Sequence, residues 1–276
     1  AEHRGKAIGI MQSGWAIGYI VAALVASVVL PRFGWRWLFV VGVLPALLVV
    51  WIRRGVHEPG IWRKGERPGL AGNNPLVIIF RRDLIGKTLL ATLMSAAVMF
   101  GYWGLFSWLP AFLAMPIERG GAGMSIVKSV GWIVPTQIGA FFGYLSFGFV
   151  SDRLGRRPSF MIYLALAAIV APAYGNLAGS PAALMALGPL LGFFGHGYFS
   201  VFGAMLAEIF PTLARGTGQG FTYNGGRALS ALAPLTIGAL ATRHGIGPAL
   251  ALTSAFFVAG ALLVLLMPET RGKQLA

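Results

Sequence analysis

The hydrophobic positions of this chain gather into eight long runs that shorter polar stretches separate. An α-helix rises 1.5 Å per residue, so about 20 apolar residues cross the roughly 30 Å hydrocarbon core of a bilayer. The second and fifth runs are shorter than this, and the others are long enough. The pattern predicts an all-α integral membrane protein in contact with the lipid bilayer, with helices at 7–30, 37–52, 88–113, 126–150, 159–177, 182–207, 216–241 and 248–267.

Two of these runs carry glycines four residues apart, Gly139 with Gly143 and Gly188 with Gly192. Residues at this spacing lie on one face of a helix, and small side chains there let two backbones approach closely. We expect these glycines to mark close helix packing and to take no part in chemistry.

Composition supports a membrane protein and argues against a nucleic-acid partner. The chain is 57% hydrophobic and 11% charged, whereas soluble domains carry roughly 25% charged residues. A net charge of +14 would indicate nucleic acid in a soluble protein, but here the basic residues lie in loops between apolar runs. Membrane topology explains them better. Without cysteine, the chain has no disulfide and no thiolate metal site, and we expect no cofactor.

The loop cations also predict an orientation. If residue 1 faces the cytoplasm, the inside loops hold 16 Lys or Arg, the outside loops hold 5, and Arg227 is the remaining one of 22. Cytoplasmic loops of membrane proteins carry such an excess of positive charge. We therefore expect a multi-pass cell (inner) membrane protein in which both ends of this segment are cytoplasmic.

The first two runs resemble the last two when Arg4 is shifted onto Arg215, a displacement of 211 residues. The shift superposes the start, the turn and the end of two consecutive helices, which indicates a parallel repeat about an axis along the membrane normal. Four further helices are then expected upstream, in a twelve-helix parent chain, and without them one wall of a central cavity is absent. The predicted parts are 1–52 as the end of an N-terminal bundle, 53–87 as a cytoplasmic linker, 88–267 as a six-helix C-terminal bundle, and 268–276 as a cytoplasmic tail.

The turn between the fourth and fifth runs has a distinctive motif, which reads Gly148-Phe-Val-Ser-Asp152-Arg153-Leu-Gly155-Arg156-Arg157-Pro158. Gly155 suits a tight turn, and the Asp152 carboxylate can accept hydrogen bonds from a helix N-terminus that faces it. The arginines can pair with an acid or simply anchor the cytoplasmic side. This pattern resembles the loop signature of the major facilitator superfamily, with the whole chain as helices five to twelve of twelve.

Two other stretches agree with this resemblance, Glu208-Ile-Phe-Pro-Thr-Leu-Ala-Arg215-Gly216 and Pro268-Glu-Thr-Arg-Gly-Lys273. The resemblance implies that Asp152 lies near the start of the first helix, at Gly5 to Ile8, and that Glu208 lies near Arg153 or Arg157. Such contacts would hold the cytoplasmic side closed. The expected gating residues are Gly148, Asp152, Arg153, Gly155, Arg156, Arg157, Glu208 and Arg215.

Arg227 is the candidate centre of a binding site. It lies 11 residues into the run 216–241, roughly 16 Å from its start, where an unpaired charge costs several kcal/mol. A guanidinium at this depth suits a carboxylate, since it can bind both oxygens. The expected substrate-binding residues at similar depth are Arg227, Asn224, Tyr223, Gln137, His196 and Tyr102.

Each of these residues also has a structural interpretation. Arg227 could bond the carbonyl groups of a broken helix, and His196 could be an interhelical hydrogen-bonder in place of a substrate ligand or proton carrier. Gln137 and Asn224 could bridge helices. Trp103, beside Tyr102, could face lipid.

The run Tyr223-Asn224-Gly-Gly-Arg227, with Glu208, resembles the proton-coupled organic-acid branches of the superfamily, namely the sialate, lactate, aromatic-acid and metabolite:proton symporters. It implies a secondary transporter of a small organic anion (a carboxylate) that works by alternating access with H⁺ symport, and no enzyme. Three alternatives remain: a sugar or drug carrier with a structural Arg227, a polytopic membrane enzyme, and a non-transporting fragment. The enzyme is disfavoured because His3, His57, His196 and His244 are scattered and show no metal-site spacing.

Overall fold

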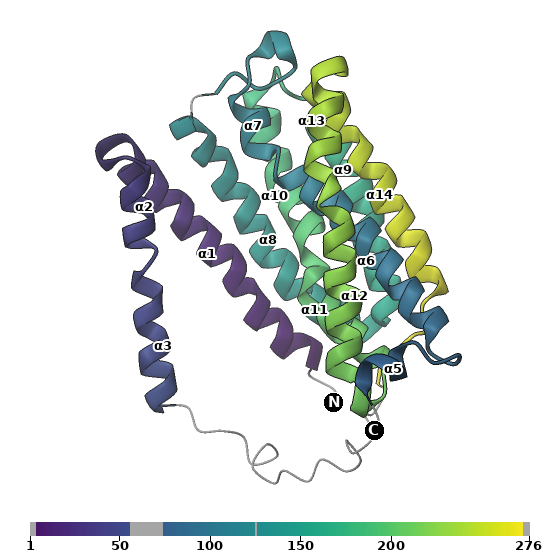
Figure 1. Cartoon of the computed structure of the whole chain (residues 1–276). Helices are drawn as coiled ribbons and strands as arrows, with labels where there is room; N and C mark the ends of the chain where they lie inside the picture. Colours follow the sequence, from purple (N-terminus) through teal and green to yellow (C-terminus); the bar gives the residue numbers. More distant parts are fainter. Residues whose placement is uncertain (1–3, 56–73, 125, 273–276) are drawn as a thin grey trace.

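The computed structural model describes residues 4–55, 74–124 and 126–272, and within these ranges every long regular element is a helix (Figure 1). The helices are α1 (Arg4–Phe33), α2 (Trp35–Val41), α3 (Leu44–Gly55), α5 (Pro75–Ile79), α6 (Ile85–Phe106), α7 (Leu109–Ala114), α8 (Ile126–Leu154), α9 (Arg156–Gly175), α10 (Pro181–Gly197), α11 (Phe199–Ile209), α12 (Arg215–Ser230), α13 (Leu232–His244) and α14 (Ile246–Leu266). Short 3₁₀ turns occupy Ile117–Arg119 and Thr212–Ala214. The all-α prediction is confirmed.

Seven helical stretches of the described chain are long and apolar enough to cross a membrane. They correspond to seven of the eight predicted runs. The eighth, 216–241, is helical as α12 and α13 but is not among the seven, because α12 is rich in glycine and polar residues. The structure therefore supports a multi-pass membrane protein, and the count of eight stays a prediction.

Prolines explain two of the breaks within the predicted runs. A proline lacks an N–H and its ring clashes with the carbonyl four residues earlier. Four residues before Pro110 lies Phe106, where α6 ends, and four before Pro234 lies Ser230, where α12 ends. The two broken helices meet, because Trp108 Nε1 donates a hydrogen bond of 2.9 Å to the carbonyl of Pro234.

The predicted glycine faces form the closest helix contact, between α8 and α10. A Cβ built on Gly139 would lie 1.9 Å from the carbonyl oxygen of Pro189, and one on Gly192 would lie 1.7 Å from that of Thr136. No heavy atom tolerates such distances, so the two backbones touch. The prediction of close packing at these glycines is confirmed.

The internal repeat is visible in the helix boundaries. Shifted by 211 residues, α1 covers the same span as α12 and α13 together, Arg215 to His244. Each unit ends at a glycine of nearly equal backbone conformation, Gly34 with φ 79° and ψ 175° and Gly245 with φ 83° and ψ 161°. The units differ in their interior, because α1 is continuous whereas its counterpart breaks at Ala231.

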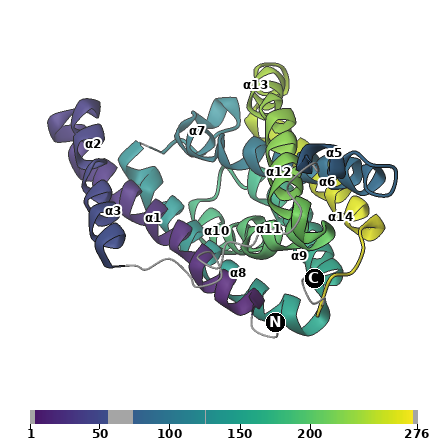
Figure 2. The ribbon, with the colours of Figure 1, turned by 60° about the horizontal axis from the view of Figure 1, so that its bottom comes forward.

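The helices α1 to α3 lie at one side of the bundle formed by the other helices (Figures 1 and 2). α1 packs against α8 and α11, whereas α2 and α3 have no buried residues. Large apolar side chains there are exposed, including Phe39 (72%), Leu47 (65%) and Trp51 (73%). Apolar surface of this extent needs a cover, which lipid or further protein can supply.

The predicted linker 53–87 is only partly described, since residues 56–73 lie outside the described residues. Its last part contains α5, whose Ile78 and Ile79 are buried, and the Thr88 hydroxyl donates a 2.7 Å hydrogen bond to the Ile79 carbonyl. The helix α5 packs against α12. The role of 53–87 as a linker stays a prediction.

Replacing Gly139 with alanine should destabilise the protein. The added methyl group would meet the Pro189 backbone, and overpacking of this kind costs roughly 1–3 kcal/mol. The Gly139→Ala variant in detergent should therefore unfold at a midpoint several degrees lower. Gly131→Ala is the control in the same helix, because that position has no heavy atom within 4 Å. Equal midpoints for the two variants would contradict the packing described here.

Candidate functional site

Two adjoining cavities lie where α1 meets the bundle. The first, named here the Arg227 cavity, has a volume of about 130 Å³. The second, the Gln137 cavity, has about 210 Å³ and shares Trp15, Tyr102 and Trp103 with the first. The Arg227 cavity is lined by Gln12, Trp15, Tyr102, Trp103, Tyr144, Phe199, Tyr223 and Arg227. The lining of the Gln137 cavity includes Trp15, Tyr19, Tyr102, Trp103, Phe106, Ser107, Gln137 and His196.

Five of the six predicted binding residues thus line these two cavities. Asn224 is the exception. It lines neither cavity, is exposed, and its amide Nδ2 donates a 2.8 Å hydrogen bond to the Gly220 carbonyl of its own helix. Successive residues of a helix point about 100° apart, so the cavity boundary falls between Tyr223 and Asn224.

The Arg227 guanidinium lies over the ring of Trp103, with Cζ 5.6 Å from the ring centroid. This cation–π contact orients the guanidinium and leaves its N–H groups available. Trp103 therefore borders the cavity and does not serve only as a lipid-facing residue. Within the residues that the structure describes, no carboxylate forms an ion pair with Arg227. A cation in such a position can bind an anionic ligand.

Aromatic rings enclose His196 and Gln137, which are only 2% and 3% exposed. The imidazole centroid lies 4.0 Å from that of Phe106 and 5.1 Å from that of Tyr102. Buried polar atoms normally have hydrogen-bond partners. In this region several have none among the described residues, namely Ser95 Oγ, Gln137 Oε1, His196 Nδ1, Tyr198 Oη and Ser200 Oγ.

A larger cavity, of about 760 Å³, lies elsewhere, near the turn between α13 and α14. Its lining includes Trp108, Glu118, Arg119 and His244 but none of the predicted binding residues. Volume alone does not identify the site, because this lining contains none of the buried unpaired polar atoms that Gln137 and His196 bring to the Gln137 cavity.

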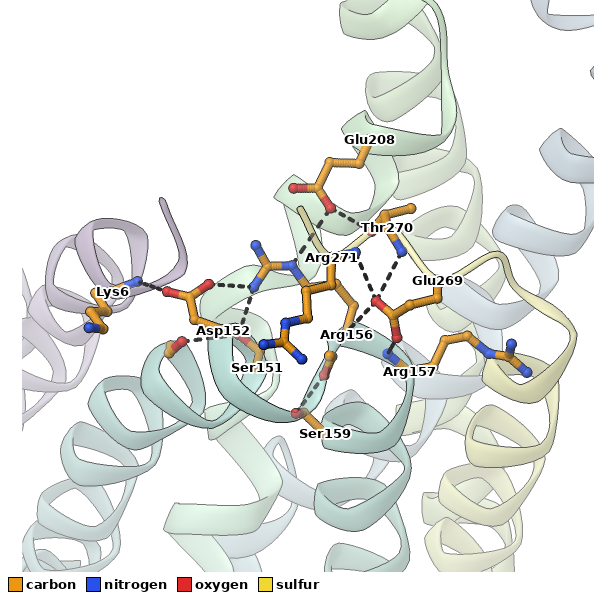
Figure 3. A network of polar contacts seen from close by, with 12 residues as sticks. Lys6, Ser151, Asp152, Arg156, Arg157, Ser159, Glu208, Glu269, Thr270 and Arg271 are labelled. Carbon is orange, nitrogen blue, oxygen red and sulfur yellow. Dashed lines mark hydrogen bonds and ion pairs between the residues drawn. The ribbon is translucent and has the colours of Figure 1, made fainter. Parts of the chain in front are cut away.

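A second polar cluster occupies the end of the bundle that holds the start of α1, the α8–α9 turn and the end of α14, here called the basic end (Figure 3). Asp152 Oδ2 accepts a 3.2 Å hydrogen bond from the backbone N–H of Lys6, in the first turn of α1. A carboxylate suits this position because a helix N-terminus carries partial positive charge and free N–H groups. The predicted contact between Asp152 and the first helix is confirmed.

Close approach of α1 and α8 makes this contact possible. A Cβ on Gly5 would lie 2.5 Å from Asp152 Oδ1, and one on Gly148 would lie 2.6 Å from the Gly5 carbonyl oxygen. Gly148 thus lets α1 approach α8. This packing accounts for its place in the motif, and no chemical role is needed.

Arg156 is the hub of the cluster. Its side chain is 4% exposed, and its Nη1 lies 2.9 Å from Asp152 Oδ1 and 2.9 Å from Ser151 Oγ. Its Nε lies 3.7 Å from Glu208 Oε2, which also accepts a 2.5 Å hydrogen bond from the Thr270 hydroxyl. The prediction places Glu208 near Arg153 or Arg157. The ion pair described here is with Arg156, the residue next to Arg157.

The remaining predicted arginines differ in their surroundings. Arg153 is exposed, Arg157 bonds the Leu265 carbonyl, and Arg215 donates a 3.0 Å hydrogen bond to the Thr212 hydroxyl at the start of α12.

Glu269 is a member of the cluster that the sequence analysis did not include. Its carboxylate accepts hydrogen bonds from the backbone N–H groups of Arg156 (2.9 Å), Arg157 (3.1 Å), Thr270 (3.0 Å) and Arg271 (2.9 Å). It therefore caps the start of α9. Partial burial favours the neutral acid and raises the pKa, but the four N–H donors outweigh it and hold the pKa of Glu269 below its usual value.

Gly155 makes room for this cap. Its φ is 107°, a conformation that side chains disfavour, and a Cβ there would lie 2.7 Å from Glu269 Oε2. The sequence offered one sign of this cap, the acidic Glu269 directly after the last apolar run. An acid that faces a helix start can serve as its cap.

Three of the known proteins that resemble this chain are transport proteins of bacteria. A protein of Haemophilus influenzae, provisionally named a metabolite transport protein, is 33% identical over all of this chain and 68% of its own length. A protein of Cupriavidus pinatubonensis, provisionally named a 4-methylmuconolactone transporter, is 34% identical over 99% of this chain and 63% of its own. The cis,cis-muconate transport protein of Acinetobacter baylyi is 31% identical over 97% of this chain and 65% of its own.

The chain spans about two thirds of the length of these curated relatives. The family model described as the Major Facilitator Superfamily matches residues 1–146 and 127–275, which together cover nearly the whole chain. This match shows that the chain belongs to the Major Facilitator Superfamily, and the names of its relatives as transport proteins agree with it.

Proposed function

We propose that this chain is part of a secondary active transporter that moves a small organic carboxylate across the cell membrane by alternating access, coupled to proton symport. The observation that carries the proposal is Arg227, a cation beside an aromatic cavity with no protein carboxylate paired to it among the described residues. The names of the muconate-related relatives support an organic acid as the substrate.

The substrate carboxylate binds the Arg227 guanidinium. Arginine presents parallel N–H groups that match both carboxylate oxygens. The Trp103 ring holds one face of the guanidinium, so the carboxylate approaches along its edge. Tyr102, Tyr223 and Gln12 border the same cavity and supply further hydrogen-bonding groups.

The basic end acts as the cytoplasmic gate. The loop cations support this orientation through the positive-inside rule. The contact between Asp152 and the start of α1 joins α1 to the six-helix bundle. When the gate opens, α1 and α8 separate and the contact breaks. Arg156 and Glu208 brace the Asp152 side of the gate, and Glu269 fixes the start of α9.

The proposal of proton coupling is based mainly on the resemblance of this chain to proton symporters. His196 lines the Gln137 cavity, and no Asp or Glu lines either cavity among the described residues. His196 therefore serves as the proton carrier or as a substrate ligand in this proposal.

Removing the guanidinium should remove carboxylate transport. A hydrogen bond to a charged group contributes roughly 1.5–3 kcal/mol, so Arg227→Ala in the full-length gene product should lower carboxylate uptake by proteoliposomes about 10- to 100-fold. Arg243→Ala removes the same charge from an exposed position at the end of α13 and serves as the control. If Arg227→Ala takes up carboxylate at the normal rate, the residue is structural and a sugar or drug carrier becomes the better assignment.

Removing the Asp152 charge should slow transport without preventing membrane insertion. Asp152→Asn weakens both the contact with Lys6 N–H and the ion pair with Arg156. We expect normal protein in the membrane fraction and a reduced uptake rate. Asp83→Asn, which changes an exposed carboxylate, should leave the rate unchanged. Full turnover by Asp152→Asn would argue against a gate at this end.

The Glu269 cap should make stability depend on acidic pH. Its folded-state pKa is depressed, so its contribution is present above the unfolded value of about 4.3 and is lost as the pH falls through the folded value. Glu269→Gln should lower the thermal midpoint in detergent at pH 7, and the gap between the two proteins should narrow as the pH falls below about 4. A gap that is constant across this range would show that the charge of Glu269 does not stabilise the fold.

A further inference from the structure

We propose that the transported carboxylate leaves Arg227 through a second, uncharged binding site closer to the cytoplasm, which Gln12, Ser200 and Gln219 form. Amide and hydroxyl groups hold the carboxylate there more weakly than the guanidinium does, and this permits release. The inference rests on the proposed function, because it takes Arg227 as the first carboxylate ligand and the basic end as the cytoplasmic gate.

The second site is a cavity of about 460 Å³ between α1, α11 and α12, named here the Gln219 cavity. Its lining includes Gln12, Ser200 and Gln219. It shares Gln12, Phe199 and Tyr223 with the Arg227 cavity, so the two cavities adjoin.

The helix α12 orders the two sites along one face. Gln219, Tyr223 and Arg227 are four residues apart, and side chains at this spacing lie above one another on a helix. Gln219 therefore lies roughly 12 Å from Arg227 along the axis. It lies nearer to the start of α12, which follows Glu208 of the basic end. A carboxylate that moves from Arg227 to Gln219 thus moves toward the cytoplasmic gate.

The internal repeat places this cavity between two equivalent helices. The shift of 211 residues carries Ile8 onto Gln219 and Gln12 onto Tyr223, and all four residues line the cavity. Equivalent residues lie on opposite sides of the axis that relates them, and in a parallel repeat this axis follows the membrane normal. The Gln219 cavity therefore lies near the axis along which a solute crosses the membrane.

The lining supplies hydrogen-bond donors without a charge. Among the described residues it contains no Asp, Glu, Lys or Arg. Ser200 is 1% exposed, and its Oγ has no hydrogen-bond partner among these residues. A buried hydroxyl without a partner is unfavourable. It can donate to a carboxylate, as can the amide groups of Gln12 and Gln219.

Two glycines bring these groups against the neighbouring helices. A Cβ on Gly203 would lie 2.9 Å from Gln219 Nε2, so glycine lets this amide lie against α11. A Cβ on Gly9 would lie 3.2 Å from Ser200 Oγ, so the backbone of α1 covers the hydroxyl. When the gate opens and α1 moves away from α8, this cover is removed and the cavity opens toward the cytoplasm.

A weaker site beside the cation makes release faster. A guanidinium binds both oxygens of a carboxylate, and tight binding slows departure. Passage through a membrane protein requires binding that is strong enough for entry and weak enough for exit. Neutral donors keep part of the hydrogen bonding and omit the charge.

Equilibrium binding to the purified full-length gene product tests the second site, with radiolabelled benzoate and cis,cis-muconate as probes. We expect a tight and a weak component in the wild type, and the weak component alone in Arg227→Ala. Adding Gln219→Leu to Arg227→Ala should weaken this component about tenfold, since one hydrogen bond is worth about a factor of ten. Adding Asn176→Leu, which changes an exposed amide at the end of α9, should leave it unchanged. A weak component that is indifferent to Gln219→Leu would overturn the inference. If the variant with Gln219→Leu does not fold, Gln219→Met replaces it with the same expected outcomes.

Gln219→Lys distinguishes recognition from a structural role. The added cation should strengthen the weak component about tenfold or more. It should also lower the maximal rate of net uptake by proteoliposomes, because the carboxylate leaves more slowly, while the KM for carboxylate outside stays near its wild-type value. Damage to the fold would not strengthen binding. Weaker binding by Gln219→Lys, or stronger binding with an unchanged maximal rate, would contradict a release site.

These results also separate this inference from the proposed function. If Arg227→Ala removes all binding and no weak component is left, only the second site fails. If the wild type binds neither probe, or if Arg227→Ala takes up carboxylate at the normal rate, the proposed function fails and this inference fails with it.

Discussion

An unpaired guanidinium beside an aromatic cavity of an apolar helical bundle is the constraint on which this account depends. A charge at membrane depth without a partner is among the most unfavourable arrangements in a membrane protein. Around Arg227 the described chain provides the Trp103 ring and tyrosine hydroxyls but no carboxylate. The protein tolerates this arrangement if water or an anion completes it, and a transporter for organic acids needs such a position.

The backbone around this cation follows from the same need. α12 ends three residues after Arg227, at a break that Pro234 imposes, and α6 ends where Pro110 imposes another. The Trp108 indole joins the two broken helices at Pro234. Free carbonyl groups at such breaks are tolerated in membranes where protein or a cavity surrounds them. Both breaks lie close to Trp103, whose ring contacts Arg227.

The basic end shows a different use of charge. There Asp152 and Glu269 each cap a helix start, and Arg156 joins Asp152 to Glu208. Two glycines make these contacts possible, since Gly148 admits α1 and Gly155 admits the Glu269 carboxylate. The ion pairs of Arg156 are almost fully buried, with side chains 3% to 11% exposed, whereas Glu269 is exposed.

Much of this arrangement was predictable from the sequence, and the exceptions have physical reasons. Apolar runs give the helices because lipid requires long uninterrupted apolar segments, and the 211-residue repeat appears in the matching turns at Gly34 and Gly245. The partner of Glu208 was not predictable, because adjacent arginines differ only in the direction that the turn gives them. Asn224 was predicted to line the cavity and does not. The sequence indicates which residues share a helix face, but it does not indicate where along that face a cavity ends. Glu269 lies 113 residues from its partner Arg156, and local patterns carry no information about such pairs.

The most direct test of the central claim is a structure of the full-length protein with a bound iodobenzoate. The account predicts a carboxylate within about 3 Å of the Arg227 guanidinium nitrogens and an iodine signal beside the rings that line the Arg227 cavity. An Asp or Glu of the protein paired with Arg227, or iodine density away from Trp15, Tyr102 and Trp103, would contradict it.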